Sequence, residues 1–344
     1  MRRNNTFLWL LSTCCLLTAC VKNNDITHPN FDYQTVYFGT QFPVRTVELG
    51  EDVYVDNSLD NAHKVAIKAT LGGTRDNTKN VEIEYYVDET LCNGLYFSAT
   101  GAKVLPLPSS YYTLTSNKIV IPKGSILGGT EVQLTDAFFA DPLSIQNTYA
   151  IPLVMKSVTG ADSILRGTAS VSNPNRCIDA NWTIKPLDYV VYAVKFVNQW
   201  HGNYLRRGKD AVTYQGESVA RDTARHTAYV ETDEVVGLKT RSLFEVNLPV
   251  IFKSKTGANI SCTLILNFND KGSCTISSAT AGITASGTGA FVKKGEKNSW
   301  GNQDRDALYL SYDVSMAQLT AKTTDTLVLR DRAVSPEYFT PVVK

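Results

Sequence analysis

The sequence has no long apolar run at its start, and its charge is balanced. The apolar stretch from Phe7 to Leu17 has eleven residues, whereas a helix needs about 20 to cross the hydrocarbon core of a bilayer. Lys and Arg together number 34 and Asp and Glu 33, for a net charge of +1. A balance of this kind argues against a nucleic-acid partner.

Motifs of the common catalytic classes are also absent. The sequence contains no His-Glu-x-x-His, no Walker loop, no dinucleotide glycine fingerprint and no Gly-x-Ser-x-Gly elbow. Of four histidines, His226 lies an odd number of positions from Glu231, which places the two on opposite faces of a strand. We therefore expect no catalytic residue, no cofactor and no metal site. A hydrolase stays the least favoured alternative, because paired carboxylates can lie far apart in sequence.

Cysteines are few, and the two late ones are not expected to pair. A hairpin predicted over residues 261–278 places Cys274 opposite Asn267. That register separates Cys274 from Cys262 by about 17 Å along a strand, beyond the roughly 7 Å that a disulfide allows between Cα atoms. We expect free, buried thiols at both positions. No C-x-x-C motif indicates a metal site.

The N-terminus carries the marks of an export signal. Arg2 and Arg3 precede the short apolar run, as in a secretory signal peptide. Leu17-Thr18-Ala19-Cys20 then resembles the bacterial lipobox, in which the cysteine is lipidated and becomes the new N-terminus. The resemblance implies a signal peptide over residues 1–19 and a lipid anchor on Cys20. The polar stretch 20–32 is expected to be a flexible tether.

From residue 33 to 172 the sequence has a period of two. Short β-branched and aromatic runs, such as 81–87 and 119–121, alternate with turn residues such as Gly72-Gly73. Short strands at this spacing predict a sandwich, here of the immunoglobulin-like kind. One short helix fits within residues 137–146.

A Pro/Asn-rich segment over residues 173–187 predicts an interdomain linker. A second series of strands, starting with 189–196, occupies residues 188–344. Consecutive, hairpin-connected strands in this number favour a closed, calycin-like antiparallel barrel. The predicted fold class is therefore all-β, with a sandwich followed by a barrel.

Five segments, spread over both halves of the sequence, carry a family likeness. Tyr149-Ala-Ile-Pro-Leu153 and 117–124 resemble the N-terminal sandwich domain of Bacteroidota surface lipoproteins, often fused to glycoside hydrolase or lectin-like modules. The segments 189–196, 200–208 and 325–332 resemble a companion domain of unknown function. The likeness implies polysaccharide capture at the outer membrane, alongside uptake proteins. A similarity to lipocalin-like barrels implies that Trp200 lies near Arg330 or Arg332.

Candidate binding residues gather between two late strands. One polar segment contains Trp300, Asn302, Asp304 and Arg305. In sugar-binding sites an exposed aromatic ring stacks on the sugar, and planar polar groups bind its hydroxyls, so this segment is a candidate binding site. The alternative is that Trp300 folds back to plug one end of the barrel.

His201 and Tyr204 are further candidates. His201 is either a polar group at the barrel mouth or a partly buried histidine that is hydrogen-bonded to the backbone. The sequence thus predicts a non-catalytic, surface-exposed outer-membrane lipoprotein that binds polysaccharide or oligosaccharide. The alternatives are an adhesion or assembly subunit and a barrel that binds a small hydrophobic ligand.

Overall fold

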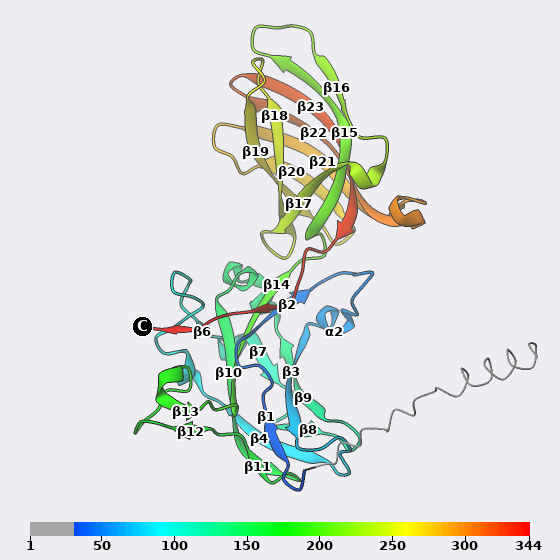
Figure 1. The fold of residues 1–344 in the computed structure, drawn as a ribbon. Coiled ribbons are helices and arrows are strands. Elements are labelled where there is room, and N and C mark those ends of the chain that lie inside the picture. The colour runs from blue at the N-terminus through cyan, green and yellow to red at the C-terminus, as the bar shows by residue number, and fades with distance from the viewer. Residues whose placement is uncertain (1–30) are drawn as a thin grey trace, which may run out of the picture.

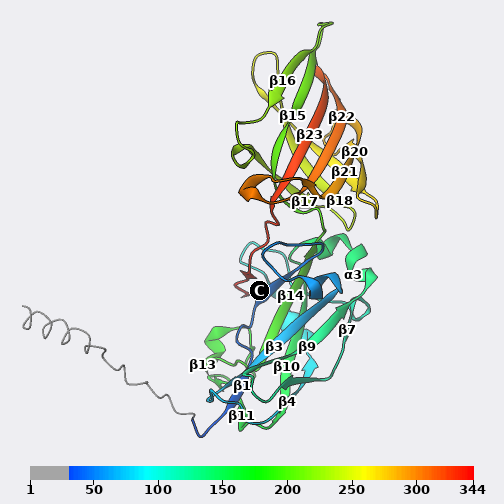
Figure 2. The same ribbon diagram turned by 90° about the vertical axis from the view of Figure 1, so that its right-hand side faces the viewer.

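Strands with alternating burial form most of the chain in the computed structural model, which describes residues 31–344. Figures 1 and 2 show two β domains stacked end to end. The strands of the first domain are β1 (Thr35–Tyr37), β2 (Pro43–Glu48), β3 (Lys64–Gly72), β4 (Val81–Val87), β5 (Leu95–Tyr96), β6 (Leu105–Pro106), β7 (Tyr112–Leu114), β8 (Lys118–Ile121), β9 (Leu127–Leu134), β10 (Tyr149–Thr159), β11 (Ser163–Ile164), β12 (Thr168–Ala169), β13 (Trp182–Ile184) and β14 (Tyr189–Val197).

Helices are short in this part of the chain. They are α2 (Ser58–Asn61), α3 (Asp136–Ala140) and the 3-10 turns η1 (Glu89–Cys92), η2 (Ser109–Tyr111), η3 (Pro142–Ile145) and η4 (Asp179–Asn181). The one helical segment predicted, 137–146, corresponds to α3 and η3. Within residues 31–344, no helix is long and apolar enough to cross a bilayer.

The first domain is a sandwich-like sheet that folds over its own core. Its strand order is β11-β1-β3-β9-β8-β4-β10-β14-β2-β24, where β24 is the late strand Glu337–Tyr338, with β6 on β10 and β7 on β9. Alternate residues of each strand point inward, so that Ile67, Ile83, Ile119 and Ile151 are all buried in one cluster. Burying such side chains is the main source of stability for the domain.

The second domain is a closed antiparallel barrel. Its strands are β15 (Gly202–Tyr214), β16 (Arg221–Arg225), β17 (Glu234–Thr240), β18 (Glu245–Lys253), β19 (Asn259–Phe268), β20 (Ser273–Ser278), β21 (Thr284–Glu296), β22 (Arg305–Met316) and β23 (Leu319–Asp331), with 3-10 turns η5 (Val230–Thr232) and η6 (Trp300–Asn302). Pairing of β15 with β23 closes a ring of eight strands, and β16 adds to the second half of β15. An all-β chain with a sandwich followed by a barrel confirms the predicted fold class.

The barrel interior is filled by side chains. Small residues on β21 make room for large ones on β22: a Cβ on Gly287 would lie 2.5 Å from the Cβ of Tyr312. Around the middle, the buried Arg206 donates to Asp325 from Nε at 3.1 Å and from Nη2 at 2.9 Å. The hydroxyl of Tyr312 donates to the same carboxylate at 2.8 Å. The centre of the barrel is therefore polar and hydrogen-bonded.

The domain boundary differs from the predicted one. The strand predicted to open the barrel, β14, pairs instead with β10 and β2 in the sandwich. Its residues are buried on both faces, as in a central strand, so its apolar pattern does not reveal which sheet it joins. The predicted linker 173–187 contains η4 and β13, and β13 pairs with β12.

The C-terminus also leaves the barrel. After β23 the chain returns to the sandwich, where β24 (Glu337–Tyr338) pairs with β2 and β25 (Val342–Val343) pairs with β5. Figures 1 and 2 show the two crossings between the domains, after β14 and after β23, beside each other. The predicted barrel domain, 188–344, is thus shorter at both ends.

The late hairpin has a register one residue from the predicted one. Cys274 pairs with Phe268, not with Asn267. The cause is the turn, where Asn269 N–H donates to Ser273 O at 2.9 Å, so three residues form the loop instead of four. Cys262 and Cys274 are nevertheless free and buried, as predicted. Burial raises the pKa of the Cys274 thiol to about 12.

Candidate ligand site at the domain junction

The base of the barrel is closed by aromatic side chains. Trp200 is 1% exposed, and its ring stacks on Phe268 with centroids 4.0 Å apart. Tyr204, a candidate binding residue, is fully buried, and its hydroxyl donates to Trp200 O at 3.0 Å. Burial raises the pKa of Tyr204. Trp200 and Tyr204 are therefore core residues of the end that faces the sandwich.

His201 lies at the same end and is held by Thr240. Its Nδ1 accepts the backbone N–H of Thr240 at 3.1 Å. Burial, with the nearby cations Arg332 and Lys239, lowers the pKa of His201 to about 4. The imidazole is therefore neutral at ordinary pH, and its bonded nitrogen anchors the first barrel strand.

Trp300 is half-buried and is tied to β23, the last strand of the barrel. Its indole N–H donates to Leu329 O at 3.2 Å. The Arg305 guanidinium lies 3.5 Å from the ring centroid, which is a cation–π contact, and Arg305 Nε also donates to Trp300 O at 3.2 Å. One face of the ring is thus covered by protein.

Asn302 and Asp304 belong to the turn that carries Trp300. Asn302 has a positive φ of 54°. Asp304 accepts from Lys297 Nζ at 2.9 Å and from Asn298 N–H at 3.1 Å. These hydrogen bonds, that of Lys297 first, lower the pKa of Asp304. Asp304 thus orders the turn and remains charged.

A crevice of about 260 Å³ lies between the two domains beside this turn. The sandwich lines it with the loop 51–54, between β2 and α2, and the barrel lines it with Lys294, 304–306 and 329–332. Of the predicted residues, the structure therefore brings Asp304 and Arg305 together in one crevice. Lys293 Nζ pairs with Glu51 at 2.6 Å and links the two walls.

An exposed apolar triplet begins at this crevice, which Val53 and Tyr54 line. Val53, Tyr54 and Val55 are 68%, 70% and 57% exposed. Exposed apolar groups rimmed by polar residues mark interaction sites, and the neighbours here are Asp52 and Asp56. The sequence reasoning missed Tyr54, although three consecutive apolar residues in a polar loop are a readable signal.

The floor of the crevice is built around Arg332, which is 4% exposed. Its Nη2 donates to Leu49 O at 2.8 Å and Asn198 O at 2.9 Å, its Nη1 to Glu51 O at 3.0 Å and its Nε to His201 O at 2.9 Å. One guanidinium thus ties two sandwich carbonyls to two carbonyls at the barrel base. This places Arg332, and not Arg330, in the expected position near Trp200.

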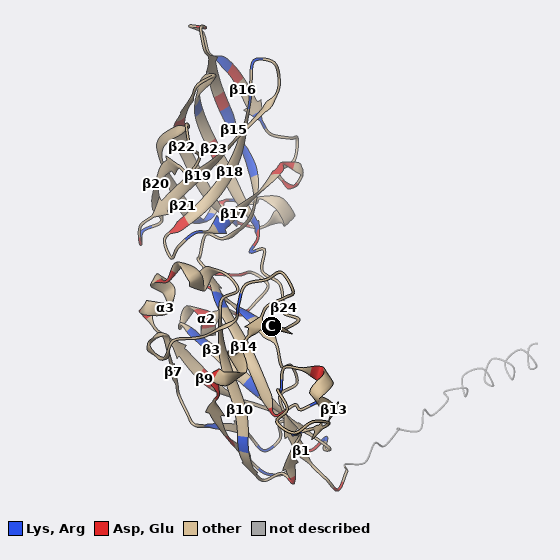
Figure 3. Cartoon of the chain, turned by 90° about the vertical axis from the view of Figure 1, so that its left-hand side faces the viewer, with Lys and Arg blue, Asp and Glu red and all other residues tan. Residues whose placement is uncertain are grey.

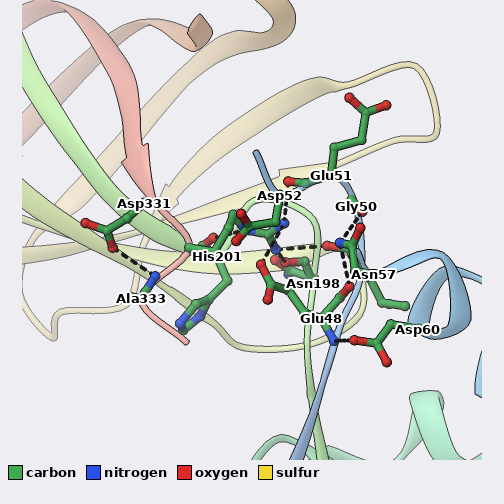
Figure 4. A network of polar contacts seen from close by, with 12 residues as sticks. Glu48, Gly50, Glu51, Asp52, Asn57, Asp60, Asn198, His201, Asp331 and Ala333 are labelled. Atoms are coloured by element: carbon green, nitrogen blue, oxygen red, sulfur yellow. Dashed lines mark hydrogen bonds and ion pairs between the residues drawn. The ribbon is translucent and has the colours of Figure 1, made fainter. Parts of the chain in front are cut away.

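A buried carboxylate accompanies this guanidinium. Glu48 lies 3.5 Å from Arg332 Nη1 and close to Asp52 and Asp60 (Figure 4). Burial raises the pKa of Glu48 to about 7, against the attraction of Arg332, and the two neighbouring carboxylates add to the rise. The loop above is fixed by Asn57 Nδ2, which donates to Glu48 O at 3.1 Å and Gly50 O at 2.6 Å. Hydrogen bonds from Arg332 and Asn57 therefore fix the backbone around the crevice.

The lining of the crevice suits hydrogen bonding to a polyol. Carboxylates and cations alternate around it, and Tyr54 supplies an aromatic face. Planar charged groups form strong, paired hydrogen bonds, while an aromatic ring supplies apolar contact. Within residues 31–344, no group of three or more His, Cys, Asp or Glu is arranged to hold a metal ion.

Comparison with known proteins identifies the family. A Bacteroides ovatus protein of unknown function, solved by structural genomics, is 50% identical to this chain, with a TM-score of 0.87. The match covers 91% of this chain and all of that one. This chain belongs to the same family. Its barrel region, residues 199–333, matches the domain of unknown function DUF5627, and residues 31–162 match a model described as a "-like, N-terminal domain".

The family boundary agrees with the structure, because residue 199 lies where the chain enters the barrel. Two more distant Bacteroides structures also align. An auxiliary nutrient-binding protein from Bacteroides thetaiotaomicron is 11% identical with a TM-score of 0.35, covering 83% of this chain and 90% of its own.

A candidate carbohydrate-binding protein from Bacteroides ovatus is 12% identical with a TM-score of 0.28, covering 89% of this chain and 98% of its own. Identities and TM-scores this low support no inference about the ligand. No curated protein matches the sequence.

Proposed function

We propose that this protein is a non-catalytic, lipid-anchored outer-membrane protein that binds a glycan in the crevice between its two domains. The observation that carries the proposal is the exposed ring of Tyr54 beside a crevice lined by carboxylates and guanidinium groups. A sugar offers C–H surfaces to the ring and hydroxyl pairs to the charged groups. The walls are held in place by Arg332 and by Asn57, so binding needs little reorganisation.

Replacing Tyr54 with alanine should weaken glycan binding by about 1–3 kcal/mol, the range for losing a central aromatic contact. The melting temperature should hardly change, because an exposed loop side chain supports little of the core. The measurement is a binding screen of the purified full-length protein against a polysaccharide panel, followed by titration of the polysaccharides that bind.

Tyr33→Ala is the matched control for this test. Tyr33 is also exposed, at 60%, but does not line the crevice, so the variant should bind as the wild type does. Equal affinities for wild type and Tyr54→Ala would rule out the crevice as the binding site.

The proposed anchor rests on the lipobox, since Cys20 lies outside the described residues. Cys20→Ala should leave the protein unlipidated and lost from the membrane fraction, because the acyl chains supply its attachment. Cells fed a clickable fatty acid should label the wild type and a Cys92→Ala control but not Cys20→Ala. A wild-type protein that takes up no label would disprove the anchor. Protease added to intact cells tests whether the protein faces outward.

A further inference from the structure

Two depressions on the outer face of the barrel form one groove. A cavity of about 530 Å³ and another of about 760 Å³ are both lined by Lys209 and Thr324. The exposed side chains come from four neighbouring strands in the order β16, β15, β23 and β22. We call this surface the barrel groove. It is separate from the junction crevice, with which it shares no lining residue.

Strand register places the side chains of the barrel groove in cross-strand rows. Arg207, Thr326 and Tyr309 form the first row, because Arg207 pairs with Thr326 and Thr326 with Tyr309. Lys209 and Thr324 belong to the second row. The third row, two residues further along each strand, contains Asp222, Ala211, Lys322 and Asp313. Successive rows lie about 7 Å apart, so the groove spans several sugar units.

The end of the groove nearest the first row is cationic. Arg207, Lys209 and His226 line it, and the only carboxylate among its lining residues is the buried Asp325. Arg207 Nε pairs with Asp233 at 2.6 Å. Within the described chain, Lys209 forms no ion pair, so its charge is uncompensated. Thr324 and Thr326 supply hydroxyl groups beside these cations.

The other end of the groove is mixed in charge. Asp222 and Asp313 lie there with Lys322, and Figure 3 shows acidic and basic residues together along the β15–β16 hairpin. The two carboxylates would repel a polymer that is charged at every unit, which disfavours nucleic acid and uniform polyanions. They accept hydrogen bonds from neutral hydroxyl groups instead.

We propose that the barrel groove is a second binding site, which takes a polysaccharide in which acidic sugars alternate with neutral ones. The carboxylate or sulfate of the acidic sugar binds Lys209 and Arg207, beside His226, and the neutral sugar lies over the third row. This site is independent of the crevice proposed above. Its recognition is by charge and hydrogen bonds, since the tyrosines that line it are Tyr309, which is half-buried, and Tyr312, which is 3% exposed.

The test compares three defined probes on the full-length protein by titration calorimetry. Hyaluronan oligosaccharides, which alternate glucuronate with a neutral sugar, should bind, while dextran and polygalacturonate should bind at least about tenfold more weakly. Raising the salt concentration should weaken hyaluronan binding, because the contact is ionic. Equal binding of dextran and hyaluronan, or binding of none of the three, would overturn the proposal.

Variants then locate the site. Lys209→Ala should weaken hyaluronan binding about tenfold, as for loss of a charged hydrogen bond, and should leave the fold intact because Lys209 is exposed. Lys271→Ala, an exposed lysine in the β19–β20 turn, is the matched control. Tyr54→Ala should leave hyaluronan binding unchanged. If Tyr54→Ala abolishes it and Lys209→Ala does not, the charged ligand binds the crevice and the barrel groove is not a site.

Discussion

Replacing Arg332 with alanine should lower the free energy of unfolding by about 3–5 kcal/mol, the range for breaking a buried ionic network from one side. The variant removes the donor for four backbone carbonyls, on Leu49, Glu51, Asn198 and His201. It also leaves the Glu48 carboxylate buried without its cation. Urea unfolding followed by tryptophan fluorescence measures the loss.

Arg330→Ala is the control for the junction, because the Arg330 side chain is 51% exposed and lies 3.8 Å from Asp331. An exposed pair of this kind contributes about 0–1 kcal/mol. If Arg332→Ala were no more destabilising than Arg330→Ala, the guanidinium would not hold the two domains together.

The pH dependence of the free energy of unfolding lost in Arg332→Ala tests the interaction of Arg332 with Glu48. The pKa of Glu48 rises from 4.5 to about 7 in the folded protein, so the folded state binds the extra proton. The stability that the Glu48 carboxyl contributes is therefore fully present below about pH 4.5 and is lost as the pH rises through 7. Without Arg332 the charged carboxylate is less favourable still, so the loss in Arg332→Ala should be larger at pH 8 than at pH 5. Glu48→Gln should remove this difference.

Strand alternation made most of the architecture predictable. Segments such as 81–87, with apolar residues at every second position, became strands with one buried face. Alternation follows from the geometry of the strand itself, so it can be read without knowledge of the partner. Hairpin connection in the second half then predicted a closed barrel, because consecutive strands pair with one another.

The assignment of strands to sheets was less predictable. Residues 189–197 are apolar on both faces, and such a strand fits the centre of either domain. It pairs in parallel with β2, and each paired residue of β2 lies 149 positions earlier in the chain, as Val44 does for Ala193. Nothing local specifies a pairing at that distance. The returning C-terminal strands β24 and β25 are two residues each and carry too little pattern to identify.

The candidate site was likewise predictable only where its features are local in the sequence. Trp300 was visible as an aromatic residue in a polar segment, but the contact of its ring with Arg305 depends on how the turn folds. Tyr54 and Asp304 come from opposite domains, and only the stacking of the domains brings them to one crevice. The lipocalin-like likeness implied Arg330 or Arg332 near Trp200. The choice of Arg332 depends on the fold of the junction, where its Nε donates to His201 O, next to Trp200 in the chain.

Replacing Asp325 with alanine should destabilise the barrel by about 3–5 kcal/mol, because it leaves the buried Arg206 guanidinium without the carboxylate to which it donates its hydrogen bonds. Its Oδ2 accepts two hydrogen bonds from Arg206, and its Oδ1 accepts one from Arg225 Nη2 at 2.6 Å. Asp325 is fully buried and Arg206 is 3% exposed, so water cannot replace the lost carboxylate. Thermal and urea unfolding of the variant measure the effect.

Asp179→Ala is the exposed counterpart. Asp179 pairs with Lys185, and the two side chains are 73% and 64% exposed, so its removal should cost less than about 1 kcal/mol. The double variant Arg206→Met, Asp325→Leu removes the central pair from both sides, and should recover part of the lost stability, since apolar replacement of a buried pair is often tolerated. If the double variant is less stable than Asp325→Ala, the polar side chains at the centre of the barrel add stability beyond the neutralisation of each other's charge.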